Sequence, residues 1–348
     1  MDLLIDSHKL HLHPGPVGRW LENGVEWPLF VEISPSGKCQ HRCTFCSFSY
    51  TGYGGAFLAP HVTIQAINDM AKGGTKAVMF AGEGEPLLNA RLDEMVYAVK
   101  EARMDASVTT NGTLLTRKFA DRLVPFLSWL RFSINAGYAD IYATLHGVSP
   151  KEFPLALKAV ELAVDAAKGT KCIVGVQSVL LPENQASLLS LALKLRELGA
   201  HYYTVKPFVP HPLASKHAAL NYQHVAAFSE QLKDLQTAQF QIIWRDNNFL
   251  RNDQERPYEQ CYGHAFRTYL AASGDIYLCS NFLGDQEWSF GNINELPFAD
   301  IWQGQRRREV VKRLNSQGLN SCRKNCPMAA MNRYLWRLKN PERHDNFI

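Results

Sequence analysis

The chain has 348 residues, of which 46% are hydrophobic and 11% aromatic, which is enough apolar material for one large domain and a smaller one. Its net charge of +4, from 37 basic and 33 acidic residues, is too small to indicate a nucleic-acid-binding protein, so nucleic acid is not an expected partner. The sequence has neither a signal-peptide pattern nor a run of about 18 uncharged apolar residues, which predicts a cytoplasmic protein without a membrane segment.

Residues 1–29 hold scattered His, Pro and Gly without a clear period, which predicts an extension that wraps a domain. From residue 29 onwards, strand-like and helix-like runs alternate as in βα units. The strand-like runs span residues 29–34, 76–82, 105–112, 130–137, 172–180 and 201–208. Six strands with helices between them predict an α/β fold, a partial (β/α)6 TIM-like barrel over residues 30–240, with ligands at the carboxyl ends of its strands.

A smaller α+β domain is predicted over residues 241–348. A polar connection follows Trp244, and the segment YLAASGDIYLCSNF then predicts a β-hairpin that turns at residues 273–275. The run QRRREVVKR after Trp302 predicts a helix whose arginines either face solvent or dock an acidic electron donor.

The chain contains eight cysteines, and in a reducing compartment they indicate metal or redox chemistry rather than disulfides. Seven of them fall into two sets by spacing, and one stands alone. The sets are Cys39, Cys43 and Cys46; then Cys261, Cys279, Cys322 and Cys326; and the single Cys172. We expect Cys172 to be a buried core thiol, although a cysteine in a barrel could also donate hydrogen in an epimerase.

The first set forms a CxxxCxxC loop directly after the first predicted strand. Three thiolates can hold a cluster of four irons and leave one iron without a protein ligand, so that a chelating molecule binds there. A partial zinc site or a chance group of thiols is the alternative interpretation.

The segment GKCQHRCTFCSF, with Phe45 before the third cysteine, resembles the signature of radical S-adenosylmethionine (SAM) enzymes. The segment AGEGEPLLN resembles their GGEP motif, with Glu83 where many members have a small residue. The resemblance implies that the cluster binds SAM and cleaves it reductively to a 5'-deoxyadenosyl radical, which takes a hydrogen atom from the substrate. It also implies the residues that contact SAM: Glu85 with Gly82 and Gly84 at the amino group, Ser133 and Asn135 at the carboxylate or ribose, and Phe45 against the adenine.

The second cysteine set can close a tetrahedral sulfur site, which suits an iron-sulfur cluster or a structural zinc. The segment CYGHAFRTYLAASGDIYLCSNF is similar to the twitch domain of radical SAM dehydrogenases, which carries one auxiliary cluster. The related SPASM domain with two auxiliary clusters needs more cysteines than this chain has. The resemblance therefore implies two [4Fe-4S] clusters, and the second could accept an electron from a substrate radical.

Polar residues near the ends of the fifth and sixth strands are candidates for contact with the substrate, and we select Gln177 and Lys206 as catalytic candidates. Lys206 could bind a carboxylate or phosphate, act as a base, or lie at an edge with its amine in solvent. We expect Tyr138, Tyr142, His146 and His211 to be packing or capping residues.

These features predict a radical SAM oxidoreductase that acts on a small polar molecule, such as a sugar, aminocyclitol or nucleotide, and oxidises an alcohol carbon. Its expected partners are this substrate and a reductant such as flavodoxin or ferredoxin. The alternatives are a radical epimerase of a carbohydrate, a peptide-modifying maturase, and a zinc-stabilised interaction protein without enzymatic activity.

Overall fold

The computed structural model describes residues 3, 5–24, 26–214, 220–222, 224–251, 255–323 and 325–347. One sheet of ten strands runs through this part of the chain, in the order β10-β9-β8-β1-β2-β3-β4-β5-β6-β7. The strands are β1 (Phe30–Ile33), β2 (Ala77–Phe80), β3 (Asp105–Thr110), β4 (Trp129–Ser133), β5 (Ile173–Leu180), β6 (Tyr202–Pro207), β7 (Gln241–Trp244), β8 (Arg267–Leu270), β9 (Asp275–Tyr277) and β10 (Ser289–Asn292). Strands β1 to β7 run parallel to their neighbours.

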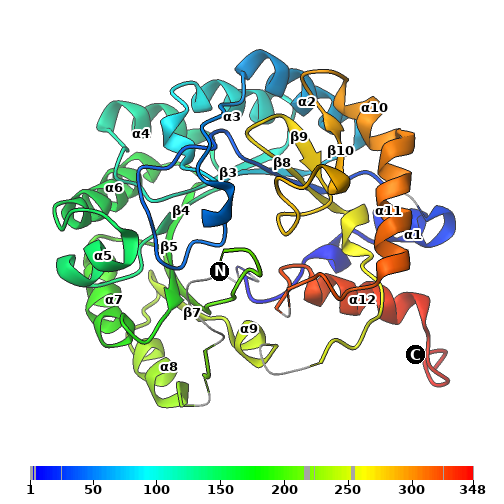
Figure 1. The fold of residues 1–348 in the computed structure, drawn as a ribbon. Coiled ribbons are helices and arrows are strands. Elements are labelled where there is room, and N and C mark those ends of the chain that lie inside the picture. The colour runs from blue at the N-terminus through cyan, green and yellow to red at the C-terminus, as the bar shows by residue number, and fades with distance from the viewer. Residues whose placement is uncertain are drawn as a thin grey trace.

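Helices surround the sheet, and Figure 1 shows α3 to α8 on the outside of the curved strands. The helices of the barrel are α2 (Pro60–Gly73), α3 (Leu92–Glu101), α4 (Arg117–Leu123), α5 (Ala139–His146), α6 (Glu152–Ala167), α7 (Leu188–Glu197) and α8 (Ala226–Lys233). The remaining helices are α1 (Pro14–Asn23), α9 (Asp246–Leu250), α10 (Phe298–Gln303), α11 (Gln305–Gln317) and α12 (Ala329–Lys339). None of the helices in the described ranges is long and apolar enough to cross a bilayer.

The alternation of side chains along the strands separates the core from the concave inner face of the barrel, which we call the lumen. In β4, Leu130 and Phe132 are buried in the main hydrophobic core, whereas the intervening Arg131 and Ser133 are only partly buried. The strand register places Ser133 beside Gln177. It also places Val179 of β5 beside Lys206 of β6. The partly buried polar side chains therefore gather on the lumen side, towards the carboxyl ends of the strands.

The predicted partial barrel is confirmed, since its sheet is mainly parallel and does not close. All six predicted strands form, and the strand β7 adds a seventh parallel strand that the sequence did not predict. The predicted hairpin forms as β8 and β9, and β8 pairs with β1 in parallel. The sheet thus continues across the boundary predicted at residue 240.

The N-terminal extension contains a helix that packs on the C-terminal region. Trp20 of α1 joins Leu10, Phe266 and Leu335 in a second hydrophobic cluster. The ring of Trp20 lies 5.1 Å from that of Tyr262, between centroids. The extension therefore links the start of the chain to the part that follows Cys261.

Candidate active site and cluster sites

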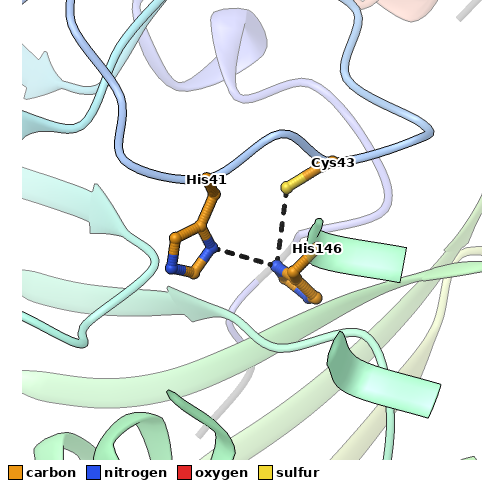
Figure 2. Close-up of side chains that lie close together, drawn as sticks. All are labelled: His41, Cys43 and His146. Atoms are coloured by element: carbon orange, nitrogen blue, oxygen red, sulfur yellow. Dashed lines mark hydrogen bonds between the residues drawn. The ribbon is translucent and has the colours of Figure 1, made fainter. Parts of the chain in front are cut away.

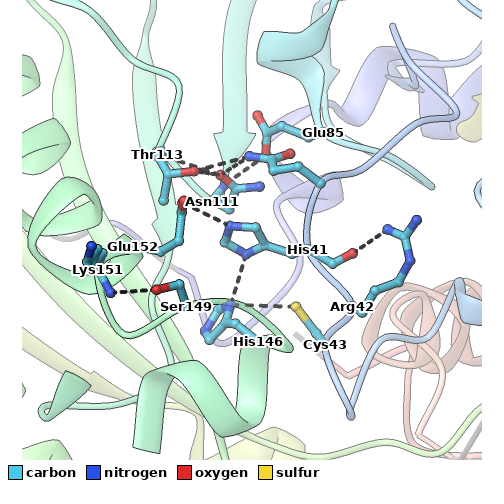
Figure 3. Close-up of polar contacts among 12 residues, drawn as sticks. His41, Arg42, Cys43, Glu85, Asn111, Thr113, His146, Ser149, Lys151 and Glu152 are labelled. Carbon is cyan, nitrogen blue, oxygen red and sulfur yellow. Dashed lines mark hydrogen bonds and ion pairs between the residues drawn. The ribbon is translucent and has the colours of Figure 1, made fainter. Parts of the chain in front are cut away.

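The three-cysteine loop, residues 39–46, is held against the end of α5 (Figure 3). The backbone amides of Arg42 and Thr44 donate to the carbonyls of His146 and Leu145, each at 2.9 Å. Gly147 ends α5 with a φ of +62°, and a Cβ at this position would come within 2.5 Å of the Arg42 carbonyl oxygen. The close approach of loop and helix therefore requires glycine here.

The same loop is attached to the ends of β2 and β3. The amide of Glu85 donates to the Lys38 carbonyl at 2.7 Å. A Cβ on Gly84 would lie 2.2 Å from the Ser36 carbonyl oxygen, so the GEGEP turn packs directly on the loop. On the β3 side, Gln40 Nε2 donates to Asn111 Oδ1 at 3.1 Å. Three strand ends thus fix the position of the loop.

The three thiols of the loop are close enough to influence one another. Burial raises the pKa of Cys39 to about 11, with Glu85 and Cys46 adding to the shift. Burial, Cys46 and Cys39 together raise the pKa of Cys43 well above its usual value. Grouped, partly buried thiols without a disulfide are suited to ligating iron, because the metal charge stabilises the thiolates that desolvation alone disfavours.

His146 lies next to one of these thiols, with its Nδ1 3.5 Å from Cys43 Sγ and 3.4 Å from His41 Nδ1 (Figure 2). Asn135 determines which nitrogen of His146 carries the proton. Its Oδ1 accepts from the amide of Val179 at 2.7 Å, so its Nδ2 faces His146 Nε2 at 3.2 Å. His146 Nε2 is then an acceptor, and the hydrogen on Nδ1 points towards the Cys43 sulfur. Burial lowers the pKa of His146 well below its usual value, which keeps the ring neutral.

The polar residues continue from His146 towards the surface. The single hydrogen on His146 Nδ1 faces both the Cys43 sulfur and His41 Nδ1, so the two atoms share it. The other ring nitrogen of His41 is Nε2. That atom lies 3.8 Å from a carboxylate oxygen of Glu152, which begins α6 (Figure 3). The expectation that His146 only packs or caps is therefore incomplete. The structure gives His146 a specific polar contact with the Cys43 thiol, which the sequence did not reveal because the two residues are 103 positions apart.

Glu85 is buried, with 3% of its surface exposed. Its carboxylate accepts from the Thr110 hydroxyl at 2.5 Å, the Asn111 amide at 2.8 Å and the Leu87 amide at 3.0 Å. Burial raises the pKa of this group, and the three donors oppose that shift. The carboxylate is therefore held rigidly between β2 and β3, beside the cysteine loop, where its contact with the SAM amino group remains a prediction.

Glu83, the residue that departs from the GGEP motif, faces the C-terminal region. Its Oε1 accepts from the amide of Ala272, in the turn between β8 and β9, at 2.9 Å. Gly82 also packs closely on this region. A Cβ at this position would lie 2.5 Å from the hydroxyl of Tyr269 in β8. The turn that carries the motif thus connects the barrel to the hairpin.

The other residues predicted to contact SAM differ in their availability. Asn135 is 2% exposed, and its amide contacts Val179 through Oδ1 and His146 through Nδ2. Since Nδ2 carries a second hydrogen, these bonds leave a donor for the SAM carboxylate or ribose, and that contact stays a prediction. Ser133 is partly exposed to the lumen, and its hydroxyl has no hydrogen-bond partner among the described residues. The ring of Phe45 stands edge-on to His146 at 5.6 Å and packs against the hydrophobic cluster of Leu145, Leu181 and Phe208.

The four C-terminal cysteines line one cavity, although Cys261 and Cys326 are 65 positions apart in the chain. Burial raises the pKa of Cys261 to about 12 and that of Cys322 to about 11. Burial also raises the pKa of Cys279, with Cys326 adding to the shift. Four thiols around one cavity form a complete sulfur ligand set for a metal cluster.

One asparagine is oriented towards this cavity in the way that Asn135 is oriented towards His146. Asn332 Oδ1 accepts from the amides of Tyr262 and Gly263, at 2.8 and 2.7 Å. Its Nδ2 consequently faces Cys261 Sγ, at 3.5 Å. Each cysteine set therefore lies next to one side-chain N–H group. In both cases, backbone amides that donate to an asparagine oxygen determine the direction of that group.

A wall of polar and aromatic residues joins the four-cysteine cavity to the mouth of the barrel. Tyr50, four residues after Cys46, stacks on His211 with 4.6 Å between ring centroids. His211 Nε2 lies 3.3 Å from the Asn281 carbonyl, and Arg323 donates to the Asn281 side chain at 3.2 Å. Asn281 and Arg323 also line the four-cysteine cavity, so the two sites share this wall.

The catalytic candidates lie in the lumen, below this wall. Burial, together with repulsion from Arg131, Arg245 and Arg323, lowers the pKa of Lys206 to about 7. Gln177 is partly buried on the neighbouring strand. Cys172, by contrast, is 3% exposed and belongs to the main core, as expected for a structural thiol.

The arginines of the predicted C-terminal helix mostly contact their own domain. Arg307 is buried and stacks on Trp302, with 3.8 Å from its guanidinium carbon to the ring centroid. Arg313 pairs with Glu287 at 2.8 Å, and Arg306 donates to the backbone carbonyls of Ser289 and Gln286. Much of α11 therefore packs against its own domain through these arginines.

Two family models match the chain, the radical SAM superfamily over residues 33–195 and an iron-sulfur cluster-binding domain, SPASM, over residues 261–327. A cofactor-modifying protein for the tungsten-containing aldehyde ferredoxin oxidoreductase of Pyrococcus furiosus is 24% identical over 80% of this chain and 81% of its own length. An S-adenosylmethionine-dependent nucleotide dehydratase from a Thermoplasmatales archaeon is 29% identical over 29% of this chain and 35% of its own length.

The fold is similar to that of SuiB from Streptococcus suis, with a TM-score of 0.67 and 17% identity over 88% of this chain and 72% of that one. Both matched family regions coincide with the two cysteine sites described above, since residues 33–195 include the CxxxCxxC loop and residues 261–327 include all four later cysteines. The chain belongs to the radical SAM superfamily, in the subfamily with a SPASM or twitch domain, and its cofactors are SAM and two [4Fe-4S] clusters.

Proposed function

We propose that this enzyme oxidises an alcohol carbon of a small polar molecule bound in the barrel lumen. The observation that carries the proposal is the position of Arg323, next to the proposed cluster ligand Cys322 in the chain. Arg323 lines the four-cysteine cavity and is also an electrostatic neighbour of Lys206 in the lumen. A substrate near Lys206 would therefore lie beside the second cluster, where an electron can be accepted.

When bound, SAM and its cluster supply a 5'-deoxyadenosyl radical that removes a hydrogen atom, and the second cluster supplies an acceptor for one electron. In the balanced reaction, the C–H hydrogen of the alcohol ends in 5'-deoxyadenosine, while one electron and the hydroxyl proton leave the substrate. The carbon-oxygen double bond then forms. The electron that cleaves SAM is matched by the electron recovered from the substrate.

The residues of this chain are proposed to bind and orient the reactants. Glu85, with Gly82 and Gly84, is our candidate for the SAM amino group, Ser133 and Asn135 are the candidates for the carboxylate or ribose, and Phe45 is the candidate for the adenine. Gln177 lies beside Ser133 in the register, so it would contact the substrate close to the site of hydrogen abstraction. Lys206 would hold the far end of the substrate.

Cys172 favours oxidation over epimerisation. An epimerase must return a hydrogen atom to its substrate radical, and a thiol is a suitable donor. Apart from the seven proposed cluster ligands, Cys172 is the chain's one remaining cysteine, and it is buried in the core. The names of two relatives, a cofactor-modifying protein and a nucleotide dehydratase, support a small-molecule substrate.

The test is an anaerobic assay with SAM, dithionite and a fractionated metabolite extract, followed by mass spectrometry. We expect one fraction to increase 5'-deoxyadenosine formation and to yield a product that has lost two hydrogen atoms. Cys279→Ala should reduce that product while SAM cleavage continues, and Cys172→Ala, the matched control, should leave both unchanged. A product of unchanged mass with an inverted centre would instead establish an epimerase, and stimulation by peptides alone would establish a maturase.

A further inference from the structure

We propose that Lys206 and Arg131 form an anion-binding subsite in the lumen, which takes a phosphate or carboxylate group of the substrate. This inference rests on the proposed function, because it assumes that the substrate enters the lumen. It adds a chemical class: the substrate carries an anionic oxygen group remote from the carbon that reacts.

Both residues project from inward-facing positions of the sheet. Arg131 follows the alternation that places Ser133 in the lumen, and Lys206 lies near the carboxyl end of β6. The strand between them has a glycine beside Arg131, because the register pairs Arg131 with Gly175. The ring of Tyr202 covers that glycine so closely that a Cβ there would lie 2.2 Å from it. Tyr202 thereby forms a floor beside the guanidinium group.

Glu32, the carboxylate whose charge acts on both cations, is already paired, and so is Asp6 beside the third cation, Arg245. Glu32 contacts Arg267 at 2.6 Å, and Asp6 contacts Arg245 at 3.0 Å. Within the described ranges, neither Lys206 nor Arg131 has a carboxylate within ion-pair distance. Arg131 donates from Nη2 to the Thr109 hydroxyl at 3.2 Å, but its buried Nε has no hydrogen-bond partner. The lumen therefore holds positive charge that the protein itself does not neutralise.

A buried cation without a partner destabilises the folded protein, so such groups are retained where a ligand supplies the missing charge. Desolvation lowers the pKa of both side chains, and repulsion among Lys206, Arg131 and Arg245 adds to this effect. A bound anion would reverse the repulsion and keep Lys206 protonated. Lys206 would then anchor the substrate rather than act as a base.

Arg323 extends the positive region to the mouth of the barrel, where it has neutral partners, Asn281 and Ser280, within the described residues. An anionic group entering past Arg323 would move towards Lys206 and then Arg131 along one gradient of charge. This direction leaves the uncharged part of the substrate near Ser133 and the cysteine loop. The geometry thus orients the substrate with its anion deep in the lumen.

The experiment is anaerobic calorimetry on the SAM-loaded holoenzyme with three probes of similar size: ribose 5-phosphate, ribonate and ribose. We expect at least one anion to bind about tenfold or more tightly than ribose, because a charge-assisted contact is absent from the neutral sugar. Lys206→Met and Arg131→Met should each abolish this difference, while Lys206→Arg should retain it. The exposed Lys168, paired with Asp165 on α6, provides the control Lys168→Met, which should change nothing.

Equal binding of all three probes, or unchanged anion binding in both Met variants, would overturn the proposal. Preference for ribose 5-phosphate or for ribonate would identify the anion as phosphate or carboxylate. Thermal unfolding without ligand adds a second readout, since removing an unpaired buried charge should leave the Tm unchanged or raise it. The oxidation is scored separately on the wild-type enzyme, by the product that has lost two hydrogen atoms, which separates a failure of this subsite from a failure of the proposed oxidation.

Discussion

The Nδ1 atom of His146 lies 3.5 Å from the Cys43 sulfur, and the contact of Asn135 with the other ring nitrogen directs a hydrogen towards that sulfur. Asn332 makes the equivalent contact with Cys261 at the second site. Hydrogen bonds to cluster sulfurs stabilise the more negative, reduced state, so they raise the reduction potential. The two clusters can therefore be adjusted separately by side chains that are not ligands.

Replacing His146 with Phe is expected to lower the potential of the SAM-binding cluster. The loss of one N–H to sulfur hydrogen bond, of up to about 1.4 kcal/mol, corresponds to about 60 mV for a one-electron couple. A redox titration followed by electron paramagnetic resonance would measure the shift. Asn135→Leu should act in the same direction, because it frees the ring to place its hydrogen on Nε2. His61→Phe, at an exposed position on α2, is the control, and an equal potential in H146F and H61F would refute the assignment.

Replacing Asn332 with Leu should lower the potential of the auxiliary cluster alone. It also leaves the amides of Tyr262 and Gly263 without their acceptor, which should cost about 1–3 kcal/mol of stability. The measurement is the same redox titration, combined with denaturant unfolding. Asn340→Leu, at the exposed end of α12, should change neither quantity. A shift in the SAM-binding cluster instead would contradict the placement of Asn332.

Gly147→Ala should prevent the cysteine loop from packing against α5, because the added methyl group would meet the Arg42 carbonyl at 2.5 Å. Gly169 offers a matched control: its φ of +76° is also left-handed, but nothing lies within 4 Å of the position that a methyl group would take. Both variants lose about 1 kcal/mol of stability to the backbone conformation. G147A should in addition lose iron from the first cluster, as measured by iron content and spectroscopy, whereas G169A should retain it. Equal iron loss in both would disprove the packing argument.

Stability should fall as the pH rises through the range in which Glu83 ionises. Burial raises the pKa of Glu83 from 4.5 to about 7, so the folded protein binds this proton more tightly than the unfolded chain. The resulting contribution to the free energy of unfolding amounts to up to about 3 kcal/mol. It is fully present below pH 4.5 and is lost between about pH 4.5 and pH 7. Denaturant unfolding of Glu83→Gln across this range should show a smaller slope. Parallel pH profiles for the wild type and E83Q would show that another group is responsible.

Much of the fold could be predicted from the sequence because each βα unit carries its own local pattern. The six predicted strands form, since their apolar runs are bounded by polar residues and glycines. Strand β7 was missed because QIIW has four residues and stands before a polar segment, so that only pairing with β6 makes it a strand. The pairing of β8 with β1 joins residues more than 230 positions apart, which no local pattern reveals.

The grouping of the cysteines into two sets could be predicted because their spacing is itself the signal. The residues around the cysteine sets could not be predicted. In the sequence His146 and Asn332 are ordinary polar residues of helices, and only the fold places them next to the sulfur atoms of Cys43 and Cys261. In the sequence Glu83 is recognised only as a departure from the GGEP motif. The structure shows that its carboxylate accepts a hydrogen bond from the amide of Ala272. The contact of Asn135 with His146 could not be predicted for a related reason. It depends on the amide of Val179, on the next strand, which donates to Asn135 Oδ1 and so turns Nδ2 towards His146.

The most direct test of the account is iron and sulfide analysis with electron paramagnetic resonance, on the intact protein and on a variant with Cys39, Cys43 and Cys46 all replaced by Ala. We predict about eight irons in the intact protein and about four in the variant, because each set of thiolates holds one four-iron cluster. Dithionite-driven formation of 5'-deoxyadenosine should be lost in the variant. About four irons with one zinc in the intact protein would remove the electron acceptor on which the proposed oxidation depends, and zinc without SAM cleavage would contradict the account as a whole.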